Sequence, residues 1–481
     1  MGWYLPLHIP FFSSYPRFPF LLLLVSIESS IEEPTDMKFD TESYVPDLLA
    51  CEYKCGIFYC NRIFYMLIEY LHSMSEGICP ICGSRNVSNL IDLGKQPLAN
   101  ELVPDLSSSL SAEKYELALN ICSDCLYVWL RKQVPPEKLF RHNTYLTGIS
   151  KETQLDMNNF ADSCIEACYF EKPEKVIDIG SNDGTLLSFF NNTGFEVLGI
   201  DPSRPAYERA KSRGIPTIND FFGDKAADEA LTSLGKVDII TGTNVITHVN
   251  DPISFLRNCK KLLKPRGSIV LEFYYFEHLL SNVAFDQIYH EHVSYLNFTT
   301  FQNLVRHVGL FPYKVEEVKS QGGSLRVFLS ADDSAGNDSS VDNFLEKEGG
   351  FEKIKSRFLS FKGKVLERRR KILGLIKMEL SRGTKIAGYG ASAKATVLLN
   401  YLGISYNDII AIADKSPIKQ GKYLPGVGIP VITSEELVGL NPDLIIIFPW
   451  NIRNEIKNTL IELFGQKKRM VTFMPHITFS V

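Results

Sequence analysis

Short apolar runs bounded by Gly, Asn or Asp recur through the middle of the chain. Runs of this length are typical of buried strands, and Thr185–Phe190 begins a helix directly after the first of them. The pattern therefore predicts an α/β sheet, with a turn at Leu262–Gly267 before the strand Ser268–Phe273. The expected strands are Lys175–Ile179, Glu196–Ile200, Val237–Thr241 and Ser268–Phe273, followed by two closing strands at Tyr313–Val318 and Ser324–Leu329.

The same pattern returns on a smaller scale near the C-terminus. Lys385–Tyr389, Ile409–Ala413 and Leu444–Phe448 predict strands, and Gly390–Lys394 begins a helix after the first. We therefore expect a second, small α/β domain. An NAD-binding fold is one interpretation, but the first turn lacks the full GxGxxG pattern.

The first 73 residues do not share this periodicity. Their strongest apolar run, Phe18–Ile27, is too short for a membrane-spanning helix. Three interpretations are open: a start codon assigned too early, a secretion or membrane signal, or a genuine extra element. The first is favoured, because Met74 lies immediately before the first cysteine pair.

Composition places the chain among globular proteins. Its 481 residues correspond to about three domains. Hydrophobic residues at 45% and charged residues at 22% exclude a disordered or low-complexity chain. A net charge of −5 lacks the basic surface that nucleic acid requires, so we expect no nucleic-acid partner and no membrane association. Ten cysteines are too few for a disulfide scaffold, which favours a cytoplasmic protein.

Four cysteines form two CxxC pairs, Cys79 with Cys82 and Cys122 with Cys125. Two residues between the thiols allow both sulfurs to face one ion. Four thiolates complete a tetrahedral zinc site with Zn–S distances of about 2.3 Å. A closed site of this type stabilises a fold and performs no chemistry. The alternative is four unliganded core cysteines. The segment Asp92–Pro97 between the pairs is expected to be a loop with turns.

The first α/β strand leads into a glycine-bearing turn, Gly180-Ser-Asn-Asp-Gly184. Strand, glycine turn and helix form the crevice at which α/β sheets bind ligands. Asp201 ends the next strand, where a carboxylate can accept hydrogen bonds from both ribose hydroxyls, and Asp220 could reach the adenine amino group. Asp183 in the turn would repel a pyrophosphate, so we favour S-adenosylmethionine over NAD. A nucleotide-binding domain without methyl transfer is the alternative.

Besides the CxxC pairs, four stretches stand out in the chain: DIGSNDGT (Asp178–Thr185), NVITHV (Asn244–Val249), FDQIYHEHVSYL (Phe285–Leu296) and GYGASAKATVLLNY (Gly388–Tyr401). With these stretches in this order, the chain from Cys79 to its end resembles the three-part C-methyltransferases of deoxysugar biosynthesis, which methylate a carbon of a nucleotide-linked ketosugar. The YHEH block is the most specific of these. Two departures stand out: Ala395 replaces a frequent glycine, and residues 1–73 have no counterpart.

The resemblance implies a fold and a domain order. The fold class is α/β, with a small zinc-binding N-terminal domain, a central class I methyltransferase domain with a seven-stranded sheet, and a Rossmann-like C-terminal domain. The expected ranges are 1–73 for the extension, 74–145 for the zinc-binding domain, 146–330 for the methyltransferase domain, 331–384 for linker and bridging helices, and 385–481 for the domain that binds the sugar nucleotide.

Methylation of carbon requires a carbanion or enolate, so a base must remove a proton next to a carbonyl and donors must stabilise the enolate oxygen. The YHEH block offers imidazoles, a carboxylate and a phenol. If it is helical, Tyr289 and His292 share a face. The resemblance assigns His292 as the base, with Tyr289, Glu291, His248 and Tyr145 around the sugar. His290 is better explained as a packing residue, and Tyr145 rests almost wholly on its family position.

The resemblance also implies ligand sets for the cofactor and the substrate, and it leaves the oligomeric state open, a monomer included. The cofactor set comprises Asp178, Gly180, Asn182, Gly184, Asp201, Asp220 and Asn244. The substrate set, in which helix N-terminal amides and a lysine suit a diphosphate, comprises Gly388, Gly390, Ser392, Lys394, Asp414, Trp450 and Asn451.

Two classes of function follow. The first is an S-adenosylmethionine-dependent C-methyltransferase, with zinc as a structural ion. The second is an O- or N-methyltransferase, or a non-catalytic nucleotide-sugar-binding protein stabilised by zinc. The intact YHEH block favours the first, because an O-methyltransferase would not need a carbon-acid base flanked by so many donors. The sequence does not identify the sugar, its nucleotide or the carbon that is methylated.

Overall fold

The structure is a computed structural model of the chain and describes residues 77–141, 146–149, 151–167, 174–333, 336 and 338–480. The extension at 1–73 and Tyr145 therefore lie outside the described residues. Within them, no helix is long and apolar enough to cross a membrane.

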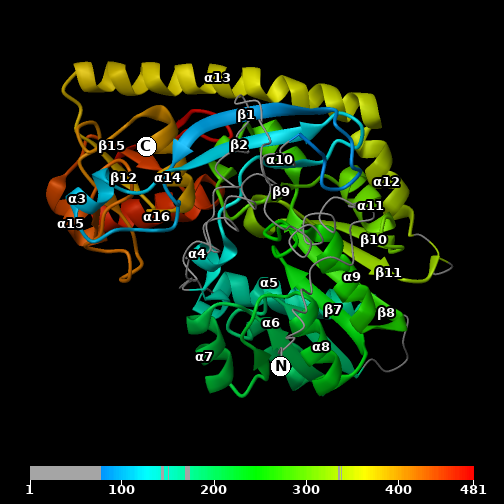
Figure 1. The fold of residues 1–481 in the computed structure, drawn as a ribbon. Coiled ribbons are helices and arrows are strands. Elements are labelled where there is room, and N and C mark those ends of the chain that lie inside the picture. The colour runs from blue at the N-terminus through cyan, green and yellow to red at the C-terminus, as the bar shows by residue number, and fades with distance from the viewer. Residues whose placement is uncertain are drawn as a thin grey trace, which may run out of the picture. The chain divides into compact units, whose positions relative to one another are not determined.

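A seven-stranded sheet forms the central part, with the strand order β10-β11-β8-β7-β4-β5-β6 (Figure 1). Six strands run in the same direction, and β11 runs antiparallel to both of its neighbours. The class I methyltransferase sheet is thus confirmed. The strands are β4 (Lys175–Ile179), β5 (Glu196–Ile200), β6 (Thr217–Ile218), β7 (Val237–Thr243), β8 (Leu263–Tyr274), β10 (Phe311–Val318) and β11 (Ser324–Ser330).

The turn expected at Leu262–Gly267 is wrong. These residues, except Leu262, form the start of β8, and the register against β7 shifts between Val237 and Ile239. An irregularity of this kind accommodates extra residues within a strand, so Pro265 and Gly267 did not interrupt the sheet as a turn would.

Both faces of this sheet are buried because successive side chains of a strand point in opposite directions. Val176 packs into one apolar cluster, together with residues of α5, α6 and α7, whereas Ile177 packs into another with α8, α9 and α11. The helices are α5 (Lys151–Glu166), α6 (Thr185–Asn192), α7 (Arg204–Ser212), α8 (Asp224–Leu234), α9 (Pro252–Leu262), α10 (Phe276–Asn282) and α11 (Phe298–Arg306), with short 3-10 turns at Thr147–Ile149, Phe285–Gln287 (η3) and Ser320–Gly322.

The N-terminal region forms a four-stranded antiparallel sheet of β1 (Val87–Gln96), β2 (Tyr115–Cys122), β3 (Val128–Leu130) and β9 (Ser294–Tyr295). The loop expected at Asp92–Pro97 is therefore largely strand, because Asp92, Lys95 and Gln96 pair with β2 across a bulge. The fourth strand, β9, comes from the range expected for the methyltransferase domain. Short helices α3 (Leu106–Leu110) and α4 (Pro136–Phe140) complete this region.

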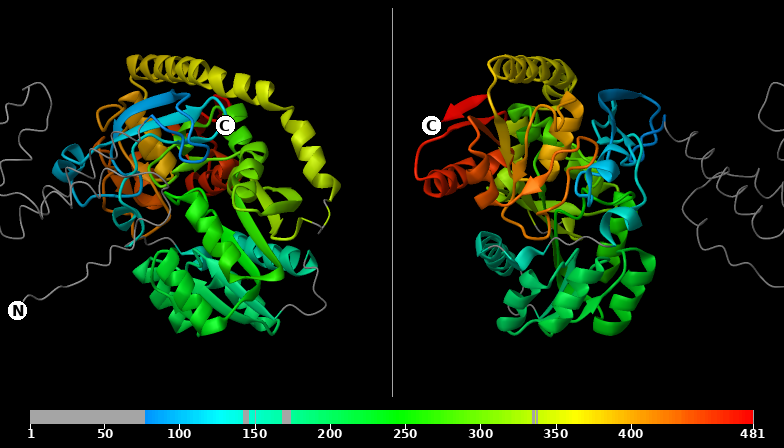
Figure 2. Two further views of the ribbon diagram at one scale, coloured as in Figure 1. Left: turned by 45° about the vertical axis from the view of Figure 1, so that its right-hand side comes forward. Right: turned by 90° about the vertical axis from the view of Figure 1, so that its left-hand side faces the viewer.

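Two helices, α12 (Ser339–Glu348) and α13 (Phe351–Ser381), lead into the C-terminal part, and α13 contacts β1 and α10 (Figures 1 and 2). The C-terminal sheet has the order β14-β13-β12-β15-β16-β17, with all pairs parallel except the last. This order confirms the Rossmann-like expectation. Its elements are β12 (Ile386–Tyr389), α14 (Ala393–Leu402), β13 (Ile412–Ala413), β14 (Val431–Ile432), α15 (Ser434–Leu440), β15 (Leu444–Ile447), a 3-10 turn at Trp450–Ile452, α16 (Arg453–Phe464), β16 (Arg469–Thr472) and β17 (Thr478–Ser480).

Candidate active site and zinc site

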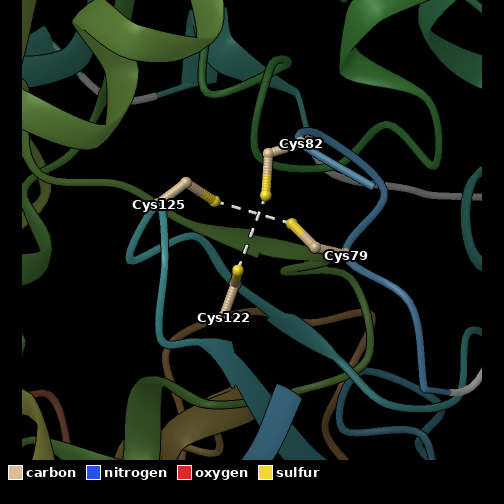
Figure 3. Close-up of side chains that lie close together, drawn as sticks. All are labelled: Cys79, Cys82, Cys122 and Cys125. Atoms are coloured by element: carbon tan, nitrogen blue, oxygen red, sulfur yellow. Dashed lines mark hydrogen bonds between the residues drawn. The ribbon is translucent and has the colours of Figure 1, made fainter. Parts of the chain in front are cut away.

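The sulfurs of the two CxxC pairs converge on one point (Figure 3). All four Sγ atoms lie within 4.8 Å of one another. Cys79 lies 3.5 Å from Cys125 between sulfurs, and Cys82 lies 3.6 Å from Cys122. The first knuckle is closed by Gly83, whose N–H donates to the carbonyl of Cys79 and whose φ is +71°.

The thiol chemistry fits a metal site. Hydrogen bonding from Cys125 lowers the pKa of Cys79 to about 5, whereas burial raises the pKa of Cys82 to about 11. Several thiolates cannot coexist at this distance without a cation, and a divalent ion with four thiolate ligands removes that repulsion. The donor set therefore suits zinc in a closed, structural site, as expected from the sequence.

The glycine turn after β4 has the backbone geometry of a ligand crevice. Gly180 and Gly184 have φ values of +72° and +74°, and Gly184 caps α6. A Cβ atom on Gly184 would lie 3.1 Å from Ile215 in a left-handed backbone conformation, so a side chain there would be crowded and strained. Asp201 is buried and accepts hydrogen bonds from the backbone N–H groups of Asn182 and Ser203, each at 2.8 Å. Asp201 therefore shapes the turn, and its remaining lone pairs can still accept from a ligand.

The repulsion that we expected between Asp183 and a pyrophosphate is wrong. The Asp183 carboxylate is 1% exposed, lies 3.2 Å from the guanidinium of Arg213 and accepts a hydrogen bond from the Thr185 hydroxyl at 2.6 Å. Because its charge is paired inside the protein, it would not repel a phosphate in the crevice.

The other predicted cofactor residues occupy different environments. Asp178 is buried, accepts from the Thr241 hydroxyl at 2.8 Å, and has its pKa raised to about 7 by burial. Asp220 pairs with Lys225 at 2.9 Å. Asn244 follows β7 with φ +58° and donates its N–H to the carbonyl of Glu272 at 2.7 Å.

The YHEH block is a hydrogen-bonded turn and not the helical turn that the sequence suggested. The N–H of His292 donates to the carbonyl of Tyr289 at 2.9 Å. The i and i+3 side chains still meet, because their ring centroids are 4.0 Å apart. His290 is buried edge-on against the ring of Tyr115 from β2, which agrees with a packing role.

The orientation of the His292 ring is defined by one hydrogen bond. Its Nδ1 lies 2.9 Å from the carbonyl oxygen of Gln287. Since a carbonyl only accepts, Nδ1 carries the hydrogen, and in the neutral ring Nε2 carries the lone pair. Burial lowers the pKa of His292 to about 4.

His248 stacks on His292 with ring centroids 5.3 Å apart. Burial, followed by the charge of His292, lowers the pKa of His248 to about 3, so both rings are neutral near pH 7. The Nε2 atom of His248 is buried and has no hydrogen-bond partner among the described residues. A buried polar atom without a partner, beside the residue expected to act as the base, is typical of a ligand-binding position.

A small cavity of about 20 Å³ lies beside His292. Sequence reasoning missed two of its tyrosines, Tyr274 and Tyr295, of which Tyr295 has a buried hydroxyl without a partner among the described residues. Tyr295 falls inside the quoted FDQIYHEHVSYL stretch, which could have indicated it. The cavity is lined by Asn244, Thr247, Tyr274, Phe276, His292, Ser294 and Tyr295.

The C-terminal domain brings three predicted substrate residues to this region. Lys394, at the start of α14, donates to Asn451 Oδ1 at 2.9 Å, and its Nζ lies 4.7 Å from the centroid of the Trp450 ring. The indole of Trp450 donates in turn to Asp286 of η3 at 3.0 Å. Asp286, which sequence reasoning missed, is 1% exposed.

The remaining substrate residues are part of the turn after β12. Asp414 accepts from the N–H groups of Ala391 and Ser416 at 2.8 and 2.9 Å, which repeats the arrangement of Asp201 in the central domain. Ser392 caps α14. A Cβ on Gly388 would lie 2.6 Å from the Phe448 ring, and one on Gly390 would lie 2.3 Å from Pro449, so both glycines permit close packing.

Three family models match the chain in the order of these regions. A zinc binding domain matches residues 79–140, a methyltransferase domain matches 155–314, and a C-methyltransferase C-terminal domain matches 319–475. The C-methyltransferase NovU of Streptomyces niveus is 29% identical over 399 residues, which cover 82% of this chain and 95% of NovU. The resemblance inferred from the sequence motifs is thereby confirmed.

Other relatives share less of the chain. The ubiquinone biosynthesis O-methyltransferases of Actinobacillus pleuropneumoniae serotype 5b and Proteus mirabilis are 36% and 32% identical to a segment that makes up 20% of this chain. The matched segment covers 43% and 40% of the length of these two relatives. The crystal structure of PH0226 from Pyrococcus horikoshii is 20% identical, covers 40% of this chain and 97% of its own, and has a TM-score of 0.32.

Proposed function

We propose that this chain, an S-adenosylmethionine-dependent methyltransferase whose regions match zinc-binding, methyltransferase and C-methyltransferase family models, methylates a carbon atom next to the keto group of a nucleotide-linked ketosugar. The observation that carries the proposal is the orientation of His292. Its Nδ1–H is engaged by the carbonyl of Gln287, which leaves Nε2 as a proton acceptor.

His292 is the proposed base. A proton next to a ketone must leave as the new carbon–carbon bond forms, and a neutral imidazole can accept it. The lowered pKa of His292 keeps the ring neutral at physiological pH. The bond to Gln287 holds the ring in one tautomer throughout, so no rearrangement precedes the proton transfer.

The side chains around His292 suit an enolate. Burial raises the pKa of Tyr289, so its phenol stays protonated and can donate to an enolate oxygen. The buried Nε2 of His248 and the buried hydroxyl of Tyr295 lack partners among the described residues and offer further contacts to the sugar. Tyr145 remains a candidate on family position alone, because it lies outside the described residues.

The crevice after β4 is the proposed cofactor site. When bound there, S-adenosylmethionine supplies an electrophilic methyl group. Gly180 permits close approach of the ligand, Asp201 can accept from the ribose hydroxyls, and the buried hydroxyl of Ser181 has no partner among the described residues. Asn244 directly follows β7 and also lines the cavity beside His292, so the proposed cofactor and sugar sites adjoin.

Lys394 is the proposed anchor for the diphosphate of the sugar nucleotide. Burial lowers its pKa, and the negative charge of Asp286 opposes that shift. A cation near the N-terminus of α14, which spans ten residues, suits a doubly charged diphosphate.

Because four-thiolate zinc sites persist where thiols stay reduced, we place the protein in the cytoplasm.

The test is turnover of a panel of nucleotide-linked 4-ketosugars with methyl-labelled S-adenosylmethionine, read by mass spectrometry. We expect one mass increment per sugar, at a carbon next to the ketone, and fragmentation should place it there. A label that appears on a sugar oxygen instead would favour the O-methyltransferase alternative. No transfer to any ketosugar, from protein that binds the cofactor, would contradict the substrate class.

A further inference from the structure

An asparagine of the N-terminal region reaches the YHEH turn. Asn100 follows β1 and is exposed, yet its Nδ2–H donates to Oε1 of Glu291 at 2.8 Å, across 191 positions of the chain. The acceptor is 7% exposed. A hydrogen bond from an exposed amide to a buried carboxylate connects the zinc-binding region with the proposed catalytic turn.

This bond makes the two oxygens of Glu291 unequal. Oε1 is engaged by Asn100, whereas Oε2 is buried and has no hydrogen-bond partner among the described residues. A buried acceptor without a partner is costly in the free protein, and a ligand hydroxyl would satisfy it. The orientation set by Asn100 determines which oxygen is left for that ligand.

Asn100 itself is fixed in place by a third part of the chain. The hydroxyl of Thr396, on α14, donates to the carbonyl of Ala99 at 2.9 Å, and both residues are buried. The backbone that carries Asn100 is therefore clamped between β1 and α14, so the amide presents its N–H to Glu291 in a defined direction.

The charges around Glu291 make this contact measurable. Burial raises the pKa of the Glu291 carboxyl, and the hydrogen bond from Asn100 opposes that rise. The other titratable groups that sense the carboxylate are the phenols of Tyr289 and Tyr295, whose pKa values it raises. Loss of the Asn100 amide should therefore be seen in the titration of Glu291 itself.

We propose that Asn100 is a positioning residue of the active site, whose amide holds Glu291 so that Oε2 accepts a hydrogen bond from a hydroxyl of the bound sugar. The identity of that ligand rests on the proposed function, whereas the contact between Asn100 and Glu291 does not. The zinc-binding region then has a role in the reaction beyond stabilising the fold.

The test compares Asn100→Asp and Asn100→Ala with a neighbouring control, Glu101→Gln, which changes a charge at an exposed position without removing the amide. Carbon-13 NMR of protein labelled at glutamate carboxyls, with Glu291→Gln to assign the signal, follows the titration of Glu291. We expect a higher pKa of Glu291 in both Asn100 variants, and the larger rise in Asn100→Asp, because two carboxyls then share one site.

Turnover gives the second measurement. Loss of a hydrogen bond to a charged group should lower kcat roughly tenfold to a hundredfold. The acidic limb of the rate profile should also move to higher pH, and cofactor affinity should stay within about twofold. Asn100→Asp is nearly isosteric, so it should keep the thermal midpoint of the parent protein. The Glu101→Gln variant should match the parent in every measurement.

An unchanged pKa of Glu291 in folded Asn100→Asp would overturn the proposal, as would a shifted pKa with unchanged turnover. These outcomes distinguish failure of the proposal for Asn100 from failure of the proposed function. If the parent protein turns over no ketosugar, the substrate class fails, while the NMR titration still decides whether Asn100 orients Glu291.

Discussion

The indole Nε1–H of Trp450 donates a hydrogen bond to Oδ2 of Asp286 at 3.0 Å, and both residues are buried. Trp450 follows the fourth parallel strand of the C-terminal domain, whereas Asp286 lies on η3, just before the YHEH turn. The ammonium group of Lys394 lies over the ring of the same indole. The three residues thus connect the proposed diphosphate anchor with the segment that carries the proposed base.

Trp450→Phe removes the donor and leaves the Asp286 carboxylate without a hydrogen-bond partner, so we expect the pKa of Asp286 to rise above its present value of about 6. The unfolding free energy should fall by about 1–3 kcal/mol. Substrate KM should rise roughly tenfold as Lys394 loses its support, which corresponds to about 1.4 kcal/mol. Trp129→Phe, in the N-terminal sheet, is the matched control, and an equal KM effect there would contradict a local role for Trp450.

His292→Ala should strongly slow removal of the proton next to the ketone. We expect exchange of that proton with deuterated water, and methyl transfer, to fall by about 10²–10⁴. Tyr289→Phe should lower the rate yet keep measurable exchange, because it removes a donor and not the base. Cofactor affinity is measured in parallel by calorimetry. Near-normal turnover by His292→Ala would indicate that His248 or Tyr145 acts as the base instead.

The cluster of Cys79, Cys82, Cys122 and Cys125 should bind one zinc ion per chain in protein purified without chelator, as measured by metal analysis. Cys122→Ser removes one thiolate, so zinc should be lost and the thermal midpoint should fall, because metal binding contributes to folding. Cys259→Ala, a buried thiol outside the cluster, should keep the zinc. A parent protein that contains no zinc would refute the assignment.

Asp178 should make stability depend on pH. Its pKa is raised to about 7 in the folded state, against about 3.9 unfolded. The unfolded chain loses this proton first, so the buried carboxyl lowers stability as pH rises from about 4 to 7, and the effect levels off above pH 7. Asp178→Asn should remove that dependence, and urea unfolding at several pH values measures it. A difference in unfolding free energy between variant and parent that stays the same at every pH would contradict the raised pKa of Asp178.

Asp201→Ala should weaken S-adenosylmethionine binding by roughly 1.5–3 kcal/mol, the range for a hydrogen bond to a charged group. Because Asp201 also accepts the N–H groups of Asn182 and Ser203, part of this loss comes from the turn itself. Asp201→Asn keeps one acceptor and should lose less. Asp228→Asn, at an exposed position of α8, is the control. Calorimetric affinity equal to that of the parent would remove Asp201 from the cofactor site.

Local patterns in the sequence determined the elements and much of the chemistry. The strands at Lys175–Ile179 and Glu196–Ile200 have the predicted bounds, because apolar residues flanked by turn formers leave a strand little freedom in register. The CxxC spacing likewise predicted a four-sulfur cluster, since each pair is a local unit. Where a local pattern failed, as at Leu262–Gly267, the residues expected to form a turn became part of β8, which carries extra residues at a register shift against β7.

Only the tertiary structure decided which distant residues meet. No periodicity relates Asn100 to Glu291 or Trp450 to Asp286, because these contacts depend on how separate sheets pack and not on spacing along the chain. The tautomer of His292 depends on the carbonyl of Gln287, which the turn brings to Nδ1. Asp183 shows the same limit: its charge suggested repulsion in the crevice until packing placed Arg213 beside it. Residue types could therefore be predicted from sequence, whereas their protonation and partners required burial and three-dimensional contact.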